Sequence, residues 1–232
     1  PWAIPSRHIS SSHRPVLLWP PTTHSGHMTQ RKSVPDHHAE SEVDYIDAML
    51  ERTTVGLRRL HEGVTRLQYT QFPDHPNVGD SAIAVGLHRY WEATGISVEG
   101  TYSLPTLGED IYSSDIPVLI NGGGNLGGLY PSFDEQRYHL AEALKPGTLL
   151  LQAPQTIHFT GPAERTRFLR RMAHRPRLRL AVRDQESLDA IKDDVAAAML
   201  VPDSVHMLGR ISAPGPTKPW IVVARRDAEG SG

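Results

Sequence analysis

The sequence IPVLINGGGNLGG, residues 116–128, places a short apolar run directly before a segment with few side chains. The apolar run predicts a buried strand, and the glycines predict a tight loop at its carboxyl end. Loops at this end of parallel strands are the usual ligand sites of open sheets, because glycine lets backbone N–H groups approach an anion closely. The candidate contacts are Gly122, Gly123, Gly124 and Asn125, although tight turns also use triple glycines.

Predicted strands and helices alternate on both sides of this stretch. Hydrophobic periodicity and end signals predict strands at about 66–72, 96–102, 117–120, 148–152 and 178–182, and helices at about 41–67, 81–94, 133–144, 162–174 and 184–198. Such alternation implies right-handed βαβ crossovers. We therefore expect an α/β fold, a doubly wound and mainly parallel sheet with helices on both faces.

Composition divides the chain into four ranges. Residues 1–40 are rich in Pro, Ser, Thr and His without any period, which predicts a disordered or non-native leader. Residues 41–209 form the predicted Rossmann-like domain. A Pro/Gly-rich linker is expected at 210–219, followed at 220–232 by the first strand of a second domain that is truncated there.

Charge and cysteine content narrow the classes of function. The chain has 232 residues, is 38% hydrophobic and carries a formal net charge of -2, so it can fill a core but shows no general nucleic-acid footprint. It contains no cysteine, which excludes disulfides and thiolate chemistry and agrees with a cytoplasmic location. No apolar run reaches the roughly 20 residues that a membrane span needs.

Polar residues follow the first predicted strand. Asn77 and Asp80 lie between that strand and the helix expected from Ser81. Asp80 is a good N-cap for this helix. Alternatively, Asn77 or Asp80 points into the ligand cleft, where it contacts a hydroxyl group or holds a cation in place.

A second group of polar residues follows the strand predicted at 148–152. We expect Gln155, Thr156 and His158 on a loop at the same edge of the sheet as the glycines. His158 is a candidate acid or base, because imidazole titrates nearest to neutral pH. The alternative for His158 is a structural hydrogen bond to the backbone.

Two further strand ends carry charged residues. Arg183 ends the strand at 178–182, and its planar guanidinium matches a carboxylate or phosphate. An internal ion pair with Asp184 or Asp80 is the alternative. Asp203 occupies a similar turn, as either a cap or a site residue.

Taken in order, these groups resemble the polysaccharide pyruvyl transferase family. The matching segments are Asn77–Asp80, Gly122–Gly127, Pro154–Phe159, Val182–Asp184 and Pro202–Asp203. The resemblance covers about 68–209, and 220–229 resembles the opening of the family's second domain. Two departures are Gly128, where the family often has an acidic residue, and Thr156, where it often has serine.

The resemblance implies the amino-terminal half of a GT-B-like architecture, in which two Rossmann-like domains face each other across a cleft. It implies transfer of a pyruvyl group from phosphoenolpyruvate to two hydroxyls of a glycan acceptor, giving a cyclic ketal. The residues expected to be catalytic are His158, Asp80 and Arg183. Those expected to bind substrate are Asn77, Gly122, Gly123, Gly124, Asn125, Gln155, Thr156 and Asp203. No cofactor and no metal are expected.

Two other readings stay open from the sequence. A GT-B-type glycosyltransferase that uses a nucleotide sugar would have the same alternating architecture. The third reading is an inactive binding or scaffold fragment. The resemblance implies that a second domain supplies a catalytic histidine and further cations, and that domain is expected to be truncated here. An uncovered partner face predicts self-association in that case.

Overall fold

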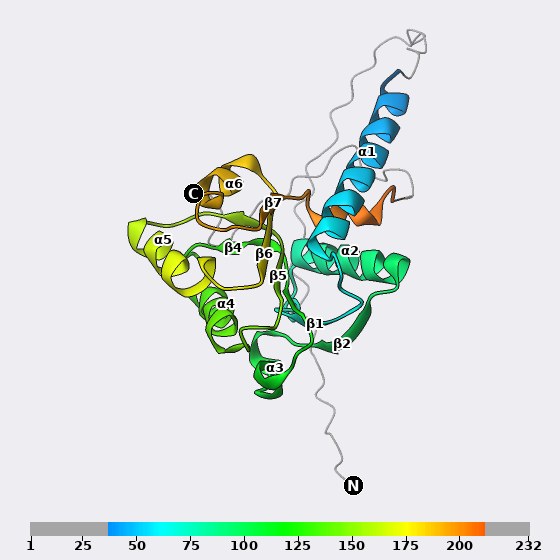
Figure 1. Ribbon diagram of the computed structural model, residues 1–232. Helices are drawn as coiled ribbons and strands as arrows, with labels where there is room; N and C mark the ends of the chain where they lie inside the picture. Colours follow the sequence, from blue (N-terminus) through cyan, green and yellow to red (C-terminus); the bar gives the residue numbers. More distant parts are fainter. Residues whose placement is uncertain (1–36, 212–232) are drawn as a thin grey trace, which may run out of the picture. The chain divides into compact units, whose positions relative to one another are not determined.

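The computed structural model describes residues 37–211, which form an α/β unit around a seven-stranded sheet (Figure 1). The strands are β1 (Arg66–Thr70), β2 (Ser97–Thr101), β3 (Val118–Ile120), β4 (Gly123–Leu126), β5 (Leu150–Ile157), β6 (Leu178–Val182) and β7 (Ala198–Leu200). Their order is β2-β1-β3-β5-β6-β7, with β4 beside β5, and each pairing is parallel. The predicted fold class is confirmed.

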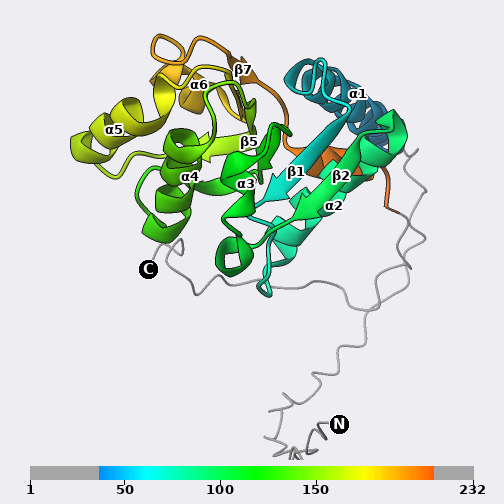
Figure 2. The ribbon, with the colours of Figure 1, turned by 60° about the horizontal axis from the view of Figure 1, so that its bottom comes forward.

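Helices cover both faces of the sheet (Figure 2). They are α1 (His37–Leu60), α2 (Val78–Thr94), α3 (Asp110–Ser113), α4 (Pro131–Ala143), α5 (Pro162–Phe168) and α6 (Gln185–Ile191), with short turns η1 (Leu104–Thr106), η2 (Leu169–Ala173) and η3 (Ser204–Leu208). Strand side chains alternate between two cores: Leu119 packs with the residues of α1 and α2, whereas Val118 and Ile120 pack with those of α4 and α5. The period of two along a strand produces this division.

The chain reverses direction across the sheet at β1. From β1 it passes to β2 on one side and then to β3 on the other. Ligands of open α/β sheets bind outside the carboxyl ends of the strands at such a switch point. A ligand site is therefore expected at the segments that follow β1 and β3.

Strand β5 is longer than the sequence predicted. It continues through Pro154 to Ile157, so Gln155 and Thr156 lie in a strand and not in a loop. A central strand tolerates this proline because the ladder with β6 is irregular between Gln152 and Gln155, where the missing N–H does not break a regular pairing. The expected glycine loop is also partly a strand, because β4 pairs Gly123 with Gln155.

Several element ends also differ from the expectations. Helix α1 begins at His37, inside the range expected as a leader. The helix predicted at 184–198 ends at Ile191, and the short strand β7 follows it. The helix predicted at 162–174 is α5 followed by one turn of π-helix, η2.

Parts of the predicted domain organisation lie outside the described residues. These are the leader up to residue 36, the linker beyond residue 211 and the strand expected at 220–232. Within residues 37–211, no helix combines the length and apolar character needed to cross a bilayer.

Candidate functional site

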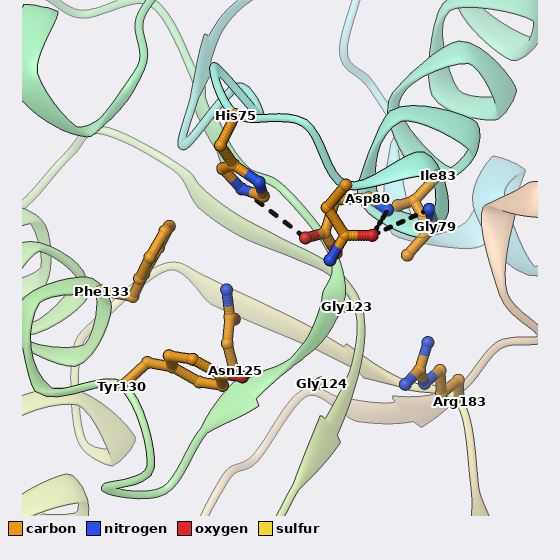
Figure 3. Close-up of a pocket in the computed structure, with 11 residues that line it drawn as sticks. His75, Gly79, Asp80, Ile83, Gly123, Gly124, Asn125, Tyr130, Phe133 and Arg183 are labelled. Atoms are coloured by element: carbon orange, nitrogen blue, oxygen red, sulfur yellow. Dashed lines mark hydrogen bonds and ion pairs between the residues drawn. The ribbon is translucent and has the colours of Figure 1, made fainter. Parts of the chain in front are cut away.

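A cavity of about 440 Å³ opens at the switch point, beyond the carboxyl ends of β1 and β3 (Figure 3). It brings together six residues that the sequence marked as site candidates: Asn77, Asp80, Gly123, Gly124, Asn125 and Arg183. The other lining residues are His75, Gly79, Ile83, Tyr130 and Phe133. The predicted convergence of separate strand ends on one hollow is therefore present in the fold.

The loop after β1 and the start of α2 form one wall. Asn77 is the N-cap of α2, and its Oδ1 accepts hydrogen bonds from the backbone N–H groups of Gly79 at 2.9 Å and Asp80 at 3.4 Å. The helix thus begins at Val78, and the expectation that Asp80 caps it is wrong. Asp80 lies instead in the first turn, where the helix dipole favours a carboxylate. Its Oδ2 is 3.6 Å from Nε2 of His75.

Gly123 and Gly124 form the floor of the cavity, and each glycine from Gly122 to Gly124 has a different local environment. A side chain at Gly122 would collide with the carbonyl oxygen of Pro154, so this glycine serves strand packing and does not line the cavity. Gly123 has φ of +137°, and a Cβ there would lie 3.5 Å from Oδ1 of Asp80. A Cβ on Gly124 would lie 3.2 Å from Nη2 of Arg183. Adjacent glycines therefore separate an acidic and a basic side chain.

Arg183 forms the opposite wall at the end of β6. Its Nε donates to Oγ1 of Thr156 at 2.8 Å and its Nη1 to Oδ2 of Asp203 at 2.6 Å. The ion pair that the structure gives Arg183 is with Asp203, whereas the sequence had suggested Asp184 or Asp80 as the partner. Because two edges of the guanidinium are held, its remaining Nη2 keeps a defined position beside Gly124.

Thr156 and Asp203 act behind Arg183 and do not line the cavity. Oγ1 of Thr156 donates to Oδ2 of Asp184 at 2.8 Å, and Oδ1 of Asp203 accepts from the N–H of Val205 at 2.9 Å. Burial alone would raise the pKa of Asp184, but hydrogen bonds from Ser187 and Thr156 and the charge of Arg183 hold that pKa below its usual range. The carboxylate is thus a stable anchor for the threonine.

Gln155 and His158 also lie outside the cavity. Gln155 is buried, and its Nε2 donates to the carbonyl of Thr156 at 3.0 Å. His158 is exposed, and its backbone N–H donates to the carbonyl of Leu126 at 3.0 Å. The acid-base role of His158 stays a prediction that the position of its side chain does not support.

Four side chains of the cavity were missed in the sequence: His75, Ile83, Tyr130 and Phe133. Tyr130 and Phe133 form an aromatic wall at the start of α4, with ring centroids 6.4 Å apart and planes at 85°. His75 stands opposite and points into the cavity (Figure 3). The only available signal was position, because His75 shares the strand-end loop with Asn77 and the aromatic pair opens the helix after the glycines.

A buried ion pair on α4 supports the floor from below. Arg137 donates through Nη1 to Oδ1 of Asp134 at 3.3 Å and to the carbonyl of Asn125 at 3.1 Å, and through Nη2 to Oδ1 of Asn125. Asp134 accepts the N–H groups of Gly127 at 3.3 Å and Gly128 at 2.7 Å. Burial lowers the pKa of Arg137 to about 10, so it is still charged at neutral pH. The pair fixes Asn125, whose side chain stands up into the cavity (Figure 3).

Comparison with known proteins agrees with the resemblance. The family model described as polysaccharide pyruvyl transferase matches residues 77–231. Pyruvyl transferase 1 of Schizosaccharomyces pombe is 31% identical over 187 residues, which are 72% of this chain and 46% of that protein.

Two proteins of Bacillus subtilis are also similar. General stress protein 30 is 28% identical over 148 residues, 59% of this chain and 43% of that protein. The putative pyruvyl transferase EpsO is 23% identical over 163 residues, 68% of this chain and 50% of that protein. The chain thus spans about half the length of the curated relatives it matches. From the family match and the 31% identity, we conclude that this chain belongs to the polysaccharide pyruvyl transferase family.

Proposed function

We propose that the cavity binds phosphoenolpyruvate, and that the protein transfers its pyruvyl group to two hydroxyls of a sugar, forming a cyclic ketal and releasing phosphate. The observation that carries this proposal is the oriented guanidinium of Arg183, whose Nη2 lies beside the side-chain-free backbone of Gly124. A planar guanidinium beside exposed backbone can bind a phosphate or a carboxylate through paired hydrogen bonds, and phosphoenolpyruvate carries both groups.

Charge balance indicates that the described residues of the cavity supply only part of the positive charge that the donor needs. Phosphoenolpyruvate brings a phosphate and a carboxylate, whereas Arg183 shares its charge with Asp203. Of the described residues that line the cavity, Arg183 is the only arginine or lysine. The resemblance implies that further cations come from a second domain, as expected for a chain that matches half of its relatives.

The aromatic wall supports a sugar as acceptor. The rings of Tyr130 and Phe133 offer apolar faces, while Asn125 and Asp80 offer polar groups in the same cavity. A sugar ring presents both C–H faces and hydroxyls, so a site of this mixed character suits it. We assign the acceptor to this end of the cavity and the phosphate of the donor to the end at Arg183.

The test is calorimetric titration of phosphoenolpyruvate into the 232-residue chain and its Arg183→Met variant. Removing a charge-assisted hydrogen bond costs about 1.5–3 kcal/mol, so we expect affinity to fall by roughly 10- to 100-fold. The matched control is Arg170→Met, which removes an exposed arginine that does not line the cavity. Equal affinities in wild type and Arg183→Met would reduce Arg183 to an internal ion pair.

The same titration separates the alternative functions. Binding of a nucleotide sugar in place of phosphoenolpyruvate would favour a glycosyltransferase. Phosphate release from phosphoenolpyruvate that depends on an added glycan acceptor would favour ketal transfer. If neither ligand binds and the chain self-associates in light scattering, the scaffold reading gains support.

A further inference from the structure

We propose that His75 is the acid that protonates the methylene carbon of phosphoenolpyruvate, with Asp80 as the residue that positions its ring. The inference rests on the function proposed above and assigns the proton donor within that site. It transfers to His75 the role that the sequence suggested for His158.

The first reason is placement. His75 lines the cavity, and its ring points across the glycine floor (Figure 3). Of the described residues that line the cavity, it is the only histidine. The side chain is 41% exposed, so a ligand in the cavity can reach it without displacing the core. A general acid must first be within reach of the atom that takes the proton.

The second reason is the partner of the ring. Oδ2 of Asp80 is 3.6 Å from Nε2 of His75, and Oδ1 of the same carboxylate faces Gly123. A carboxylate at this distance favours one orientation of the ring, so the ring keeps its direction toward the cavity. Asp80 is itself fixed by its place in the first turn of α2. The carboxylate thus links the position of the ring to that of the floor.

The third reason is the separation of charges. Arg183 stands at Gly124 and Asp80 at Gly123, so the anion contact and the proton donor approach the floor from different sides. Phosphoenolpyruvate has the same asymmetry. Its phosphate is attached to the central carbon, and its methylene carbon is double-bonded to that carbon and points in another direction. A donor with its phosphate toward Arg183 can present its methylene group to the side where His75 stands.

The proton balance closes with one histidine. The imidazolium gives its proton to the methylene carbon, which becomes a methyl group. A sugar hydroxyl oxygen bonds to the adjacent carbon, and its proton returns to the neutral imidazole. The second hydroxyl then replaces phosphate on that carbon, and its proton leaves with the phosphate. No oxidant or metal enters the balance.

The activity test compares three single substitutions in the 232-residue chain with phosphoenolpyruvate and a glycan acceptor. Loss of a general acid lowers turnover by about 100-fold or more, so we expect this loss in phosphate release for His75→Gln while calorimetric binding of phosphoenolpyruvate is retained. The control is His174→Gln, an exposed histidine that does not line the cavity, and it should leave turnover unchanged. Full turnover in His75→Gln, or a loss in His158→Gln instead, would overturn the inference.

A second readout does not depend on turnover. The ring resonances of His75 should shift in NMR spectra when phosphoenolpyruvate is added, and Asp80→Asn should reduce that shift because the ring loses the carboxylate that positions it. Binding of phosphoenolpyruvate without any change at His75 overturns the inference and leaves the proposed function standing. Absence of phosphoenolpyruvate binding to the wild-type chain overturns the proposed function, and the inference with it.

Discussion

Two arginines flank the glycine strand β4 and serve different purposes. Arg137 lies below it with a side chain that is 0% exposed, and its hydrogen bonds use Nε, Nη1 and Nη2. Arg183 lies at the cavity with a side chain that is 30% exposed, and its hydrogen bonds to described residues use Nε and Nη1. A guanidinium whose three nitrogens all bond within the protein stabilises the fold. A guanidinium with one nitrogen at the edge of the cavity can also bind a ligand.

The largest effect is expected from Arg137→Met. Removing one partner of a buried ion pair leaves the other charge unpaired, which costs about 3–5 kcal/mol. The carbonyl and side chain of Asn125 lose their donor as well. Urea unfolding should therefore show a large fall in the free energy of unfolding, with the midpoint shifted and the slope unchanged.

Two variants sharpen this result. Arg183→Met should lower the free energy of unfolding by about 1 kcal/mol at most, because its partly exposed ion pair is screened by water. The double variant Arg137→Met with Asp134→Asn should recover part of the loss, since it leaves no unpaired buried charge. Equal losses for the two single variants would remove the distinction between a supporting and a ligand-binding arginine.

Two histidines repeat the contrast between buried and open groups. His61 is buried under α1 and α2, and it accepts from Nε1 of Trp91 at its Nε2 over 3.1 Å while its Nδ1 faces the carbonyl of Leu57 at 2.8 Å. Both ring nitrogens are thus used by the neutral form. Burial, the largest cause, lowers the pKa of His61 to about 4 despite the bond to Leu57, whereas His75 stands in the open cavity.

Acid should therefore destabilise the fold through His61. In the unfolded chain the ring of His61 is protonated below its usual pKa near 6.5, whereas in the folded chain it stays neutral until about pH 4. The sign is a loss of stability as pH falls through this window, with a total of about 3 kcal/mol from the difference in pKa.

The measurement is the free energy of urea unfolding from pH 7 to pH 4.5, for wild type and for His61→Gln. The variant cannot be protonated, so its unfolding free energy should vary less with pH, even if its value at pH 7 is lower. Carboxylates titrate alike in both proteins and cancel in the comparison. Parallel pH dependences in the two proteins would show that another group causes the acid loss.

The sequence predicted the elements whose signals are local. Strand β6 was predicted at its observed bounds, because a mostly apolar segment ends at a charged pair there. Strand β5 was cut short in the prediction, because Pro154 usually ends a strand and only the register with β6 shows why it is tolerated. Neighbouring strands decided that outcome, and they are distant in sequence.

The same limit applies to the site. Asp80, Asn125 and Arg183 were predicted because the carboxyl ends of parallel strands meet at one edge. The aromatic wall was not, since its position depends on how α4 enters the fold, and the buried pair of Asp134 and Arg137 fixes that entry. A tertiary ion pair of this kind has no local signature in the sequence.

An effect of about the same small size is expected at Asn77, which lines the cavity but uses its carbonyl oxygen within the fold. Asn77→Ala removes the N-cap of α2 and should lower the free energy of unfolding by about 1 kcal/mol, whereas Asn77→Asp keeps an acceptor and should stay near wild type. Urea unfolding of both variants measures the cap, and calorimetry with phosphoenolpyruvate measures the site. Because the oxygen is already used, we expect the alanine variant to lose stability and to keep its affinity. A fall in affinity with unchanged stability would instead identify Asn77 as a ligand contact, the role proposed for Arg183. In that case the rule drawn from the two arginines would not extend to amide side chains.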